Sequence, residues 1–333
     1  MAEDGDVVSP SPAAAWSRLR LRQSTHLRDL TDETTFSMAH LVQPVFVVEG
    51  LAAPEPIAGL GDNARHGEQD ALARIGRDLE AGVRHVLLFA VPGERDDRPA
   101  RFPVMAQAVR AIKTAFGDAL HLWVDICLCA WTRHGHCALF DDRGGIDLGP
   151  TLASLGAAAV SAADAGADGI SPSDMMDGRT ASLRQALDEA GHQRVTMMSY
   201  STKFASHFYG PFRGAADSAP RHGDRRHYQI DVRARHDALA SSVRCAREGA
   251  DLLMVKPGLT SLDLIDPIRT STGRLVGAYQ VSGEYASLVG LAERGFGDFD
   301  ALLRETLLVF RRAGAGYVIT YGARRGRTLG LAG

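Results

Sequence analysis

Short apolar runs alternate with longer amphipathic or alanine-rich segments along most of the chain. Eight apolar runs have the length and composition of buried β-strands, and they lie at Leu41–Val48, His85–Val91, Leu120–Cys127, Asp168–Ser171, Arg194–Tyr200, Leu252–Lys256, Leu275–Val281 and Tyr317–Tyr321. The helices expected between them include Glu68–Ala81, Arg101–Phe116, Thr151–Ala165, Thr180–Gly191, Arg235–Gly249 and Phe299–Gly314. Several of these segments end at glycine, which commonly closes a helix.

This alternation is typical of a parallel α/β protein, because strands that are covered by helices on both faces are apolar throughout. A count of eight strands favours a closed (β/α)8 barrel of the TIM type over an open doubly wound sheet. No GxGxxG motif follows the first strand, which weakens a dinucleotide-binding interpretation. We expect residues 1–35 to form an extended, partly disordered N-terminal arm and residues 36–333 to form the catalytic barrel.

Length and charge narrow the classes of protein that fit this pattern. The chain has 333 residues, 45% of them apolar, which is enough for one large barrel with a sizeable core. Its net charge of −3 gives no indication of a nucleic-acid or membrane partner. No apolar run is long enough to span a bilayer, and the acidic N-terminal stretch lacks the apolar region of a secretory signal. We therefore expect a cytoplasmic protein.

Lysine is rare in this chain, and two lysines fall where a barrel enzyme keeps its catalytic groups. Lys and Arg together total 37, but the only lysines are Lys113, Lys203 and Lys256. Active sites of β/α barrels lie at the C-terminal ends of the strands, where Lys203 and Lys256 are expected on neighbouring strands. Two close, poorly hydrated ammonium groups favour the neutral amine that attacks a ketone. The alternative is that each lysine forms a structural ion pair. Lys113 lies in a helical segment and is expected to be a solvated surface residue.

A cluster of cysteines follows the third predicted strand, with Cys127, Cys129 and Cys137 inside eleven residues. A secreted disulfide framework would spread and pair its cysteines, so this clustering favours a metal site. Side chains alternate along a strand, which puts the first two thiols on one side, and a returning loop can bring in the third. Three thiolates with an open fourth position suit a catalytic Zn²⁺, whereas the alternative is three buried free thiols. His134 and His136 are weaker candidates for the same site.

A long segment rich in arginine and aromatic residues, 204–231, follows Lys203 before the next expected helix. A loop of this length is usually a lid or a disordered segment. Arginines such as Arg213 and Arg225 on a lid suit a substrate that carries a carboxylate, through bidentate pairing. The same mixture is also compatible with single-stranded nucleic acid or with an ordinary solvated loop. The net charge and the lysine pair count against nucleic acid.

Seven segments carry a resemblance to a known family: DICLCAWTRHGHC, SPSDMMDGR, SYSTKFASHFYGPFR, SAPRHGDRRHYQ, MVKPG, YQVSGEY and ITY. In order and spacing they resemble the signature segments of the porphobilinogen synthase (5-aminolevulinate dehydratase) family, in its zinc-using branch. The resemblance runs from about residue 17 to the C-terminus. It implies a barrel lyase of tetrapyrrole (heme) biosynthesis that condenses two 5-aminolevulinate molecules to porphobilinogen, with loss of two waters, through lysine Schiff bases. It also implies a homo-octamer.

The resemblance assigns roles to individual residues. Lys256 resembles the lysine that forms the Schiff base with the first-bound (P-side) substrate, and Lys203 its partner for the second (A-side) substrate. Cys127, Cys129 and Cys137 resemble the Zn²⁺ ligands. The other matched positions are Arg213, Arg225 and Gln229 for the A-side carboxylate, Ser282 and Tyr321 for the P-side carboxylate, and Asp125 and Ser173 around the reacting centre.

Some positions depart from the family pattern. Ser241 stands where many bacterial relatives have a glutamate for an allosteric magnesium, so the resemblance leaves magnesium regulation open. Further departures are at Thr260–Ser261, Gly93–Pro103 and Gly316. They leave room for a diverged paralogue or a Schiff-base aldolase that acts on another amino-ketone. A non-catalytic zinc-binding barrel is a third alternative, but it gives no reason to keep two lysines and three cysteines.

Overall fold

A computed structural model describes residue 20 and residues 22–331 of the chain. Contacts divide the chain into two units, Met1–Thr35 and Phe36–Gly333. In the first unit, helix α3 (Thr25–Leu30) begins after Ser24, whose hydroxyl accepts a hydrogen bond from the backbone N–H of Leu27. The N-terminal arm expected at residues 1–35 stays a prediction, and its residues 1–19 and 21 lie outside the described part.

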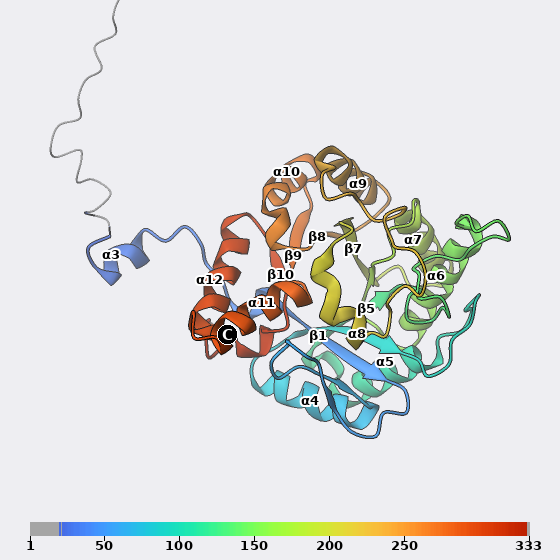
Figure 1. Ribbon diagram of the computed structural model, residues 1–333, viewed down its shortest axis with the longest axis horizontal. Helices are drawn as coiled ribbons and strands as arrows, with labels where there is room; N and C mark the ends of the chain where they lie inside the picture. Colours follow the sequence, from blue (N-terminus) through green and yellow to red (C-terminus); the bar gives the residue numbers. More distant parts are fainter. Residues whose placement is uncertain (1–19, 21, 332–333) are drawn as a thin grey trace, which may run out of the picture. The chain divides into compact units, whose positions relative to one another are not determined.

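The second unit is built on a closed barrel of eight parallel strands, which confirms the expected fold (Figure 1). In chain order the strands are β1 (Leu41–Val48), β4 (His85–Val91), β5 (His121–Ile126), β6 (Gly169–Pro172), β7 (Thr196–Lys203), β8 (Leu252–Lys256), β9 (Leu275–Tyr279) and β10 (Tyr317–Ile319). Each pairs with the next, and the last pairs with the first, with Leu41 beside Val318 and Val42 beside Ile319. Barrel closure leaves none of these eight strands at a free edge.

Helices surround the strands, so the strands are covered on their outer faces (Figure 1). The helices are α4 (Glu68–Glu80), α5 (Pro103–Phe116), α6 (Leu148–Asp164), α7 (Arg179–Glu189), α9 (Arg235–Arg247), α10 (Leu262–Thr272), α11 (Ser282–Glu293) and α12 (Phe299–Arg312). Individual residues at the helix ends explain where several of these helices begin. Pro103 begins α5, where its missing N–H costs nothing, and Asp298 caps α12 by accepting the N–H of Ala301.

The structure also contains elements that the hydrophobic pattern did not predict. A short hairpin, β2 (Glu55–Pro56) with β3 (Ala64–His66), extends the sheet beside β1. Helices α10 and α11 are absent from the predicted set. The arginine-rich segment is not a plain loop, because it forms a 3₁₀ turn at His207–Tyr209 and helix α8 (Gly210–Ala215).

The expectation for Lys113 is wrong. Its side chain is only 17% exposed, and its Nζ donates to both carboxylate oxygens of Asp168 at 2.9 Å and to the carbonyl of Gly117 at 2.9 Å. Asp168 directly precedes β6 and Gly117 lies between α5 and β5, so both partners are at the end of the barrel opposite the C-terminal strand ends. Lys113 is thus a structural ion-pair residue. Among the described residues, none of the helices combines the length and apolar character that a membrane crossing requires.

Candidate active site

Two lysines lie side by side at the C-terminal ends of neighbouring strands. Lys203 is the last residue of β7 and Lys256 the last of β8, and the two are partners in the register of the pair. Both are buried, with 5% and 4% of their surface exposed. The aromatic ring of Tyr200 lies close to both amines, with its centroid 5.7 Å from Nζ of Lys203 and 4.8 Å from Nζ of Lys256. The structure therefore places the two predicted nucleophiles next to each other and away from solvent.

Aromatic rings enclose the Lys256 amine. Besides Tyr200, the ring centroids of Tyr279, Phe212 and Tyr209 lie 4.0, 4.9 and 5.4 Å from its Nζ. The rings come from β9, from helix α8 and from the turn before α8, and they exclude water from the amine. Burial, together with the nearby Lys203 charge, lowers the pKa of Lys256 to about 7. A large share of this amine is therefore neutral, and so nucleophilic, at neutral pH.

The pH dependence of this amine can be measured without any substrate. Formaldehyde with cyanoborohydride methylates neutral amines, so we expect methylation of Lys256 to rise with pH around a midpoint near 7. Peptide mass spectrometry separates the three lysines, and Lys113 serves as the reference for reagent concentration. In denaturant the midpoint should return toward the ordinary value of 10.5. A midpoint near 10.5 in the folded protein contradicts the prediction.

Lys203 is held in place by the backbone of a neighbouring strand. Its Nζ donates a hydrogen bond to the carbonyl of Ser173, which directly follows β6. The N–H of Ser173 donates to the carbonyl of Ile126 at the end of β5, so this acceptor is itself fixed. Asp125, also on β5, faces the same space. Burial raises the pKa of Asp125 to about 6, against a hydrogen bond from Ser173 and the charges of both lysines. Asp125 can therefore gain or lose a proton near neutral pH.

The three clustered cysteines come together as the sequence predicts. Their sulfur atoms all lie within 4.8 Å of one another, and all three residues are buried. The Cys127 thiol donates to the sulfur of Cys129 over 3.3 Å. Hydrogen bonds from Cys127 and Cys129 hold the pKa of Cys137 well below its usual range, while Cys127, as a donor, has its pKa raised. Cys137 is therefore the member of the trio that most readily becomes a thiolate, the form that binds metals.

This cluster fits a soft or borderline metal ion, because three sulfur donors converge within 4.8 Å of one another in a buried site. The two histidines of the loop are not part of it. Both ring nitrogens of His136 are engaged, Nδ1 with the Tyr228 hydroxyl at 3.1 Å and Nε2 with the carbonyl of His222 at 2.9 Å. His134 accepts the N–H of His136. Both therefore shape the loop that carries the thiols.

The arginine-rich segment lies closed over the cysteine loop. Arg225, which is 6% exposed, donates to the carbonyls of Gly135 and Ser218. The hydroxyl of Tyr228 accepts the N–H of Cys137 at 3.4 Å. Phe212, Asp125, Cys127, Cys129 and Trp131 are among the residues that line the remaining cavity, whose volume is about 20 Å³. That is room for about one water molecule, so a larger ligand requires this lid to open.

The predicted substrate-binding residues differ in whether their polar atoms already have hydrogen-bond partners. Within the described residues, the amide of Gln229 and Nε of Arg213 are buried without hydrogen-bond partners. The Ser282 hydroxyl accepts the N–H of Phe212 at 3.0 Å, so it currently binds the lid. Tyr321 is 1% exposed and its ring centroid lies 6.4 Å from that of Tyr279. Arg225 is engaged with the protein itself, because it donates to the carbonyl of Gly135 in the cysteine loop and to that of Ser218 in the lid segment. Its role in substrate binding stays a prediction.

Two sets of residues at this site were not predicted from the sequence. The first is the aromatic enclosure of Lys256, for which the only signal was the density of Tyr and Phe around the lysine motifs. The second is Arg179 at the start of α7, which is 1% exposed and donates to the carbonyl of Tyr200 at 3.0 Å. Its signal was weak, because arginine at the start of a helix is usually solvated.

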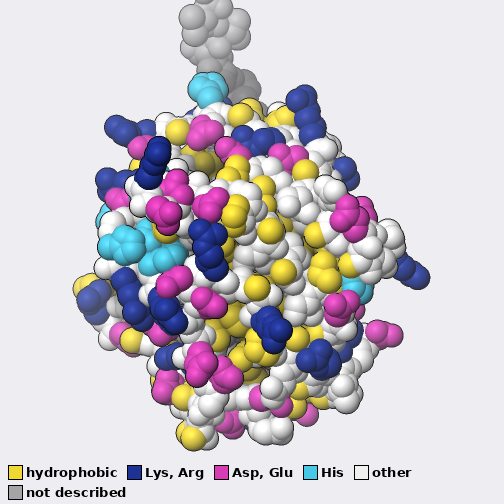
Figure 2. All heavy atoms as spheres, turned by 90° about the vertical axis from the view of Figure 1, so that its right-hand side faces the viewer, with side chains coloured by type: hydrophobic (Ala, Val, Ile, Leu, Met, Phe, Trp, Pro, Cys, Tyr) yellow, Lys and Arg dark blue, Asp and Glu magenta, His cyan; other side chains and the backbone are white. Residues whose placement is uncertain are grey.

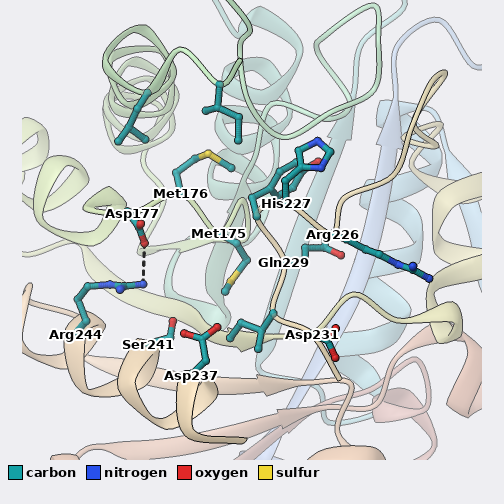
Figure 3. Close-up of a pocket in the computed structure, with 14 residues that line it drawn as sticks. Met175, Met176, Asp177, Arg226, His227, Gln229, Asp231, Asp237, Ser241 and Arg244 are labelled. Carbon is teal, nitrogen blue, oxygen red and sulfur yellow. Dashed lines mark ion pairs between the residues drawn. The ribbon is translucent and has the colours of Figure 1, made fainter. Parts of the chain in front are cut away.

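A second, open cavity of about 610 Å³ lies beside α9, outside the barrel (Figure 3). An ion pair of 2.9 Å between Arg244 and Asp177 lies in its wall, and Gln229 and Met175 line the side toward the lid. Ser241, also in its lining, is buried and donates to the carbonyl of Ser201 in β7 at 2.6 Å. The serine that departs from the family pattern is therefore a structural hydrogen-bond donor here.

The distribution of surface charge bears on whether the arginine-rich segment binds nucleic acid. On the face shown in Figure 2, basic and acidic side chains are interspersed, and no continuous basic stripe crosses it. Arg226 of the lid segment pairs with Asp224, and Arg233, just beyond the segment, pairs with Asp231. This pattern does not favour the nucleic-acid interpretation of the segment.

Comparisons with known proteins agree with this arrangement. The family model described as delta-aminolevulinic acid dehydratase matches residues 17–328. Proteins of that name from Halalkalibacterium halodurans and Staphylococcus epidermidis are each 39% identical over 92% of this chain, covering 94% and 95% of their own lengths. A crystal structure of the Toxoplasma gondii enzyme with its reaction product porphobilinogen superposes with a TM-score of 0.89. It is 34% identical and covers 97% of this chain and 92% of its own. The chain is thus a barrel protein that belongs to the delta-aminolevulinic acid dehydratase family.

Proposed function

We propose that this protein condenses two molecules of 5-aminolevulinate to porphobilinogen with loss of two waters, as a hydro-lyase of tetrapyrrole (heme) biosynthesis. The observation that carries the proposal is the pair of buried, register-matched lysines over one tyrosine ring. One such lysine is common in Schiff-base enzymes, whereas two suit a reaction that holds two ketones at once. Membership of the family and the likeness to a product-bound relative support the same reaction.

The chemistry follows from the surroundings of each amine. The neutral Lys256 amine attacks the ketone of the first substrate, and loss of water gives an imine inside the aromatic enclosure. Lys203 captures the second ketone a few ångströms away. Asp125, with a pKa near 6, accepts and returns protons between the two centres. With the lid closed, little water remains to hydrolyse the imines before the two substrates join.

The two substrate carboxylates are held on opposite sides of the lysines in this proposal. Arg213, Arg225 and Gln229 of the lid take the A-side carboxylate. The unpaired donors of Arg213 and Gln229 support this role, because buried donors need acceptors. Ser282 and Tyr321 take the P-side carboxylate, which requires the Ser282 hydroxyl to exchange its bond with Phe212 for the substrate. Ser173 orients Asp125 and Lys203.

Cys127, Cys129 and Cys137 would hold a Zn²⁺ ion, which makes this chain a member of the zinc-using branch. Bound there, the ion would act as a Lewis acid toward the A-side substrate. The three converging sulfurs and the lowered pKa of Cys137 support this choice of metal. A homo-octamer and a cytoplasmic location, both expected from the sequence analysis, stay predictions.

The proposal is tested by incubating the zinc-loaded protein with 5-aminolevulinate, assaying the pyrrole colorimetrically and then trapping imines with borohydride. We expect pyrrole formation and a substrate-sized adduct on Lys256, located by peptide mass spectrometry. An adduct without pyrrole identifies a Schiff-base aldolase or a diverged paralogue for another amino-ketone. Absence of both products leaves the proposal without support and favours a zinc-binding barrel that has no catalytic role.

A further inference from the structure

Strand β7 carries an irregularity directly before Lys203. Along the pair of β7 with β8, Ser199 lies beside Leu253 and Thr202 beside Val255, so three steps on β7 correspond to two on β8. One extra residue is therefore inserted, as in a β-bulge, which re-aims the side chains that follow. The bulge contains Tyr200, whose ring approaches both amines, and Ser201. The direction of Lys203 thus depends on how this bulge is held.

Arg179 holds the bulge from helix α7. Its Nη2 donates to the carbonyl of Tyr200 at 3.0 Å, and its Nη1 donates to the carbonyl of Met176 at 3.1 Å. Its Nε lies 3.9 Å from Oδ2 of Asp174, and both side chains of this ion pair are almost fully buried. Removing a charged group from water costs free energy, so a buried arginine is retained where its geometry matters. Its planar guanidinium group can bind two acceptors at once in fixed positions.

Arg179 contacts the turn that begins at Ser173, whose carbonyl accepts the hydrogen bond from Lys203. Ser173 accepts the hydrogen bond from Lys203, and the next residue, Asp174, accepts the N–H of Met176 at 2.7 Å. Between them Met175 has φ = +77°, a conformation that non-glycine residues rarely adopt. Strained backbone of this kind persists only where its surroundings enforce it, and it is frequent at functional sites. Arg179 therefore bonds to both sides of the Lys203–Ser173 contact.

We propose that Arg179 is a positioning residue for the Lys203 amine: by tying the β7 bulge to the turn after β6, it keeps that amine on the Ser173 carbonyl. The inference rests on the proposed imine-forming role of Lys203. It does not make Arg179 a group that touches substrate, because its donors point to backbone carbonyls, to the Met175 sulfur and to Asp174.

The simplest competing explanation is that Arg179 only stabilises the fold. Arg184, on the same helix, offers a matched control, because it also donates to two backbone carbonyls, those of Val195 at 2.8 Å and His192 at 2.9 Å. These carbonyls lie before the start of β7, at the end of the barrel remote from the lysines. A purely structural role predicts that Arg179→Met and Arg184→Met lose stability but that both keep the wild-type ratio of Lys203 to Lys256 adduct.

The experiment uses full-length, zinc-loaded protein with Arg179→Met, Arg179→Lys or Arg184→Met, and compares only variants whose thermal melts show a folded state. Borohydride trapping with 5-aminolevulinate is read separately at each of the three lysines by mass spectrometry. We expect both Arg179 variants to lose Lys203 adduct relative to Lys256 adduct by about 10- to 100-fold, the scale expected when a reacting group is misplaced by about 1 Å. Their kcat should fall while KM changes less. The Arg184→Met variant should keep the wild-type ratio of adducts.

A second readout does not depend on the substrate. In the Arg179 variants a loosened bulge admits small reagents, so formaldehyde methylation of Lys203 should rise relative to Lys256 while substrate capture falls. If the wild type forms no adduct with 5-aminolevulinate, the proposed function fails, but the methylation comparison still tests the positioning role. Unchanged Lys203-to-Lys256 ratios in folded Arg179 variants overturn the inference. So does failure of both Arg179 variants to fold while Arg184→Met folds, because that outcome identifies a structural role.

Discussion

Replacement of Lys256 with methionine is expected to abolish pyrrole formation, with a fall in kcat of about 10⁴-fold or more, the scale seen when a covalent nucleophile is removed. Methionine keeps the length and volume of the side chain in the aromatic enclosure but cannot form an imine. The fold should not suffer. The amine is 4% exposed and surrounded by rings, so its removal relieves the cost of burying a charge. We expect a melting temperature equal to or above that of the wild type.

Two further variants make this result specific. Lys256→Arg keeps the positive charge but cannot lose its proton, so it should be as inactive as the methionine variant. Lys113→Arg changes the lysine that is not part of the active-site pair and that lies at the far end of the barrel, so this variant should keep turnover. Turnover by Lys256→Met within tenfold of the wild type would exclude an imine at this residue and leave the lysine pair without its proposed purpose.

Removal of one thiol from the cysteine cluster should remove the metal and the activity together. In Cys137→Ala, the group whose pKa is lowered by two donated hydrogen bonds is lost, and two sulfurs remain for an ion that prefers four ligands. We expect bound zinc, measured by elemental analysis after dialysis, to fall from about one ion per chain toward none. Metal affinity should drop by more than about 100-fold, which exceeds the effect of changing a residue that only hydrogen-bonds to a metal ligand.

The fourth cysteine provides the control. Cys245 is buried in α9 and is not part of the cluster, so Cys245→Ala should keep both its zinc and its turnover. In the wild type, chelation should abolish pyrrole formation, and added Zn²⁺ should restore it. Full activity of thoroughly chelated wild-type protein, or zinc retained by Cys137→Ala, would show that the three thiols are not the metal ligands.

The lid and the cysteine loop act on each other in this structure. Arg225 bonds the carbonyl of Gly135, and Tyr228 accepts the N–H of Cys137, so the closed lid is attached to the loop that carries the third sulfur. The lid also reaches Lys256, because the hydroxyl of Tyr209 donates to the carbonyls of Phe204 and Lys256. The closed lid therefore contacts both the strand end that carries Lys256 and the loop that carries the third thiol.

Much of the barrel could be predicted from the sequence, because strands buried on both faces are continuous apolar runs. All eight barrel strands were located this way, with ends that differ by a few residues, as for Leu120–Cys127 against β5. Helix α11 was missed. Its buried positions include polar Ser282 and Glu284, which weaken a helical hydrophobic pattern. Lys113 was misplaced because a helical pattern does not show which charged partner, here Asp168, lies across the barrel end.

The sequence by itself determined the fold class, the position of Lys203 and Lys256 at the mouth and the convergence of three thiols, because each follows from periodicity or from short-range spacing. Only the tertiary structure decided the surroundings that give those groups their chemistry. The rings around Lys256 come from β7, β9 and the lid, and the bulge that aims Lys203 is held by Arg179 from another helix. Burial, proximity and amine basicity depend on contacts between segments far apart in the chain, and no local pattern of residues encodes them.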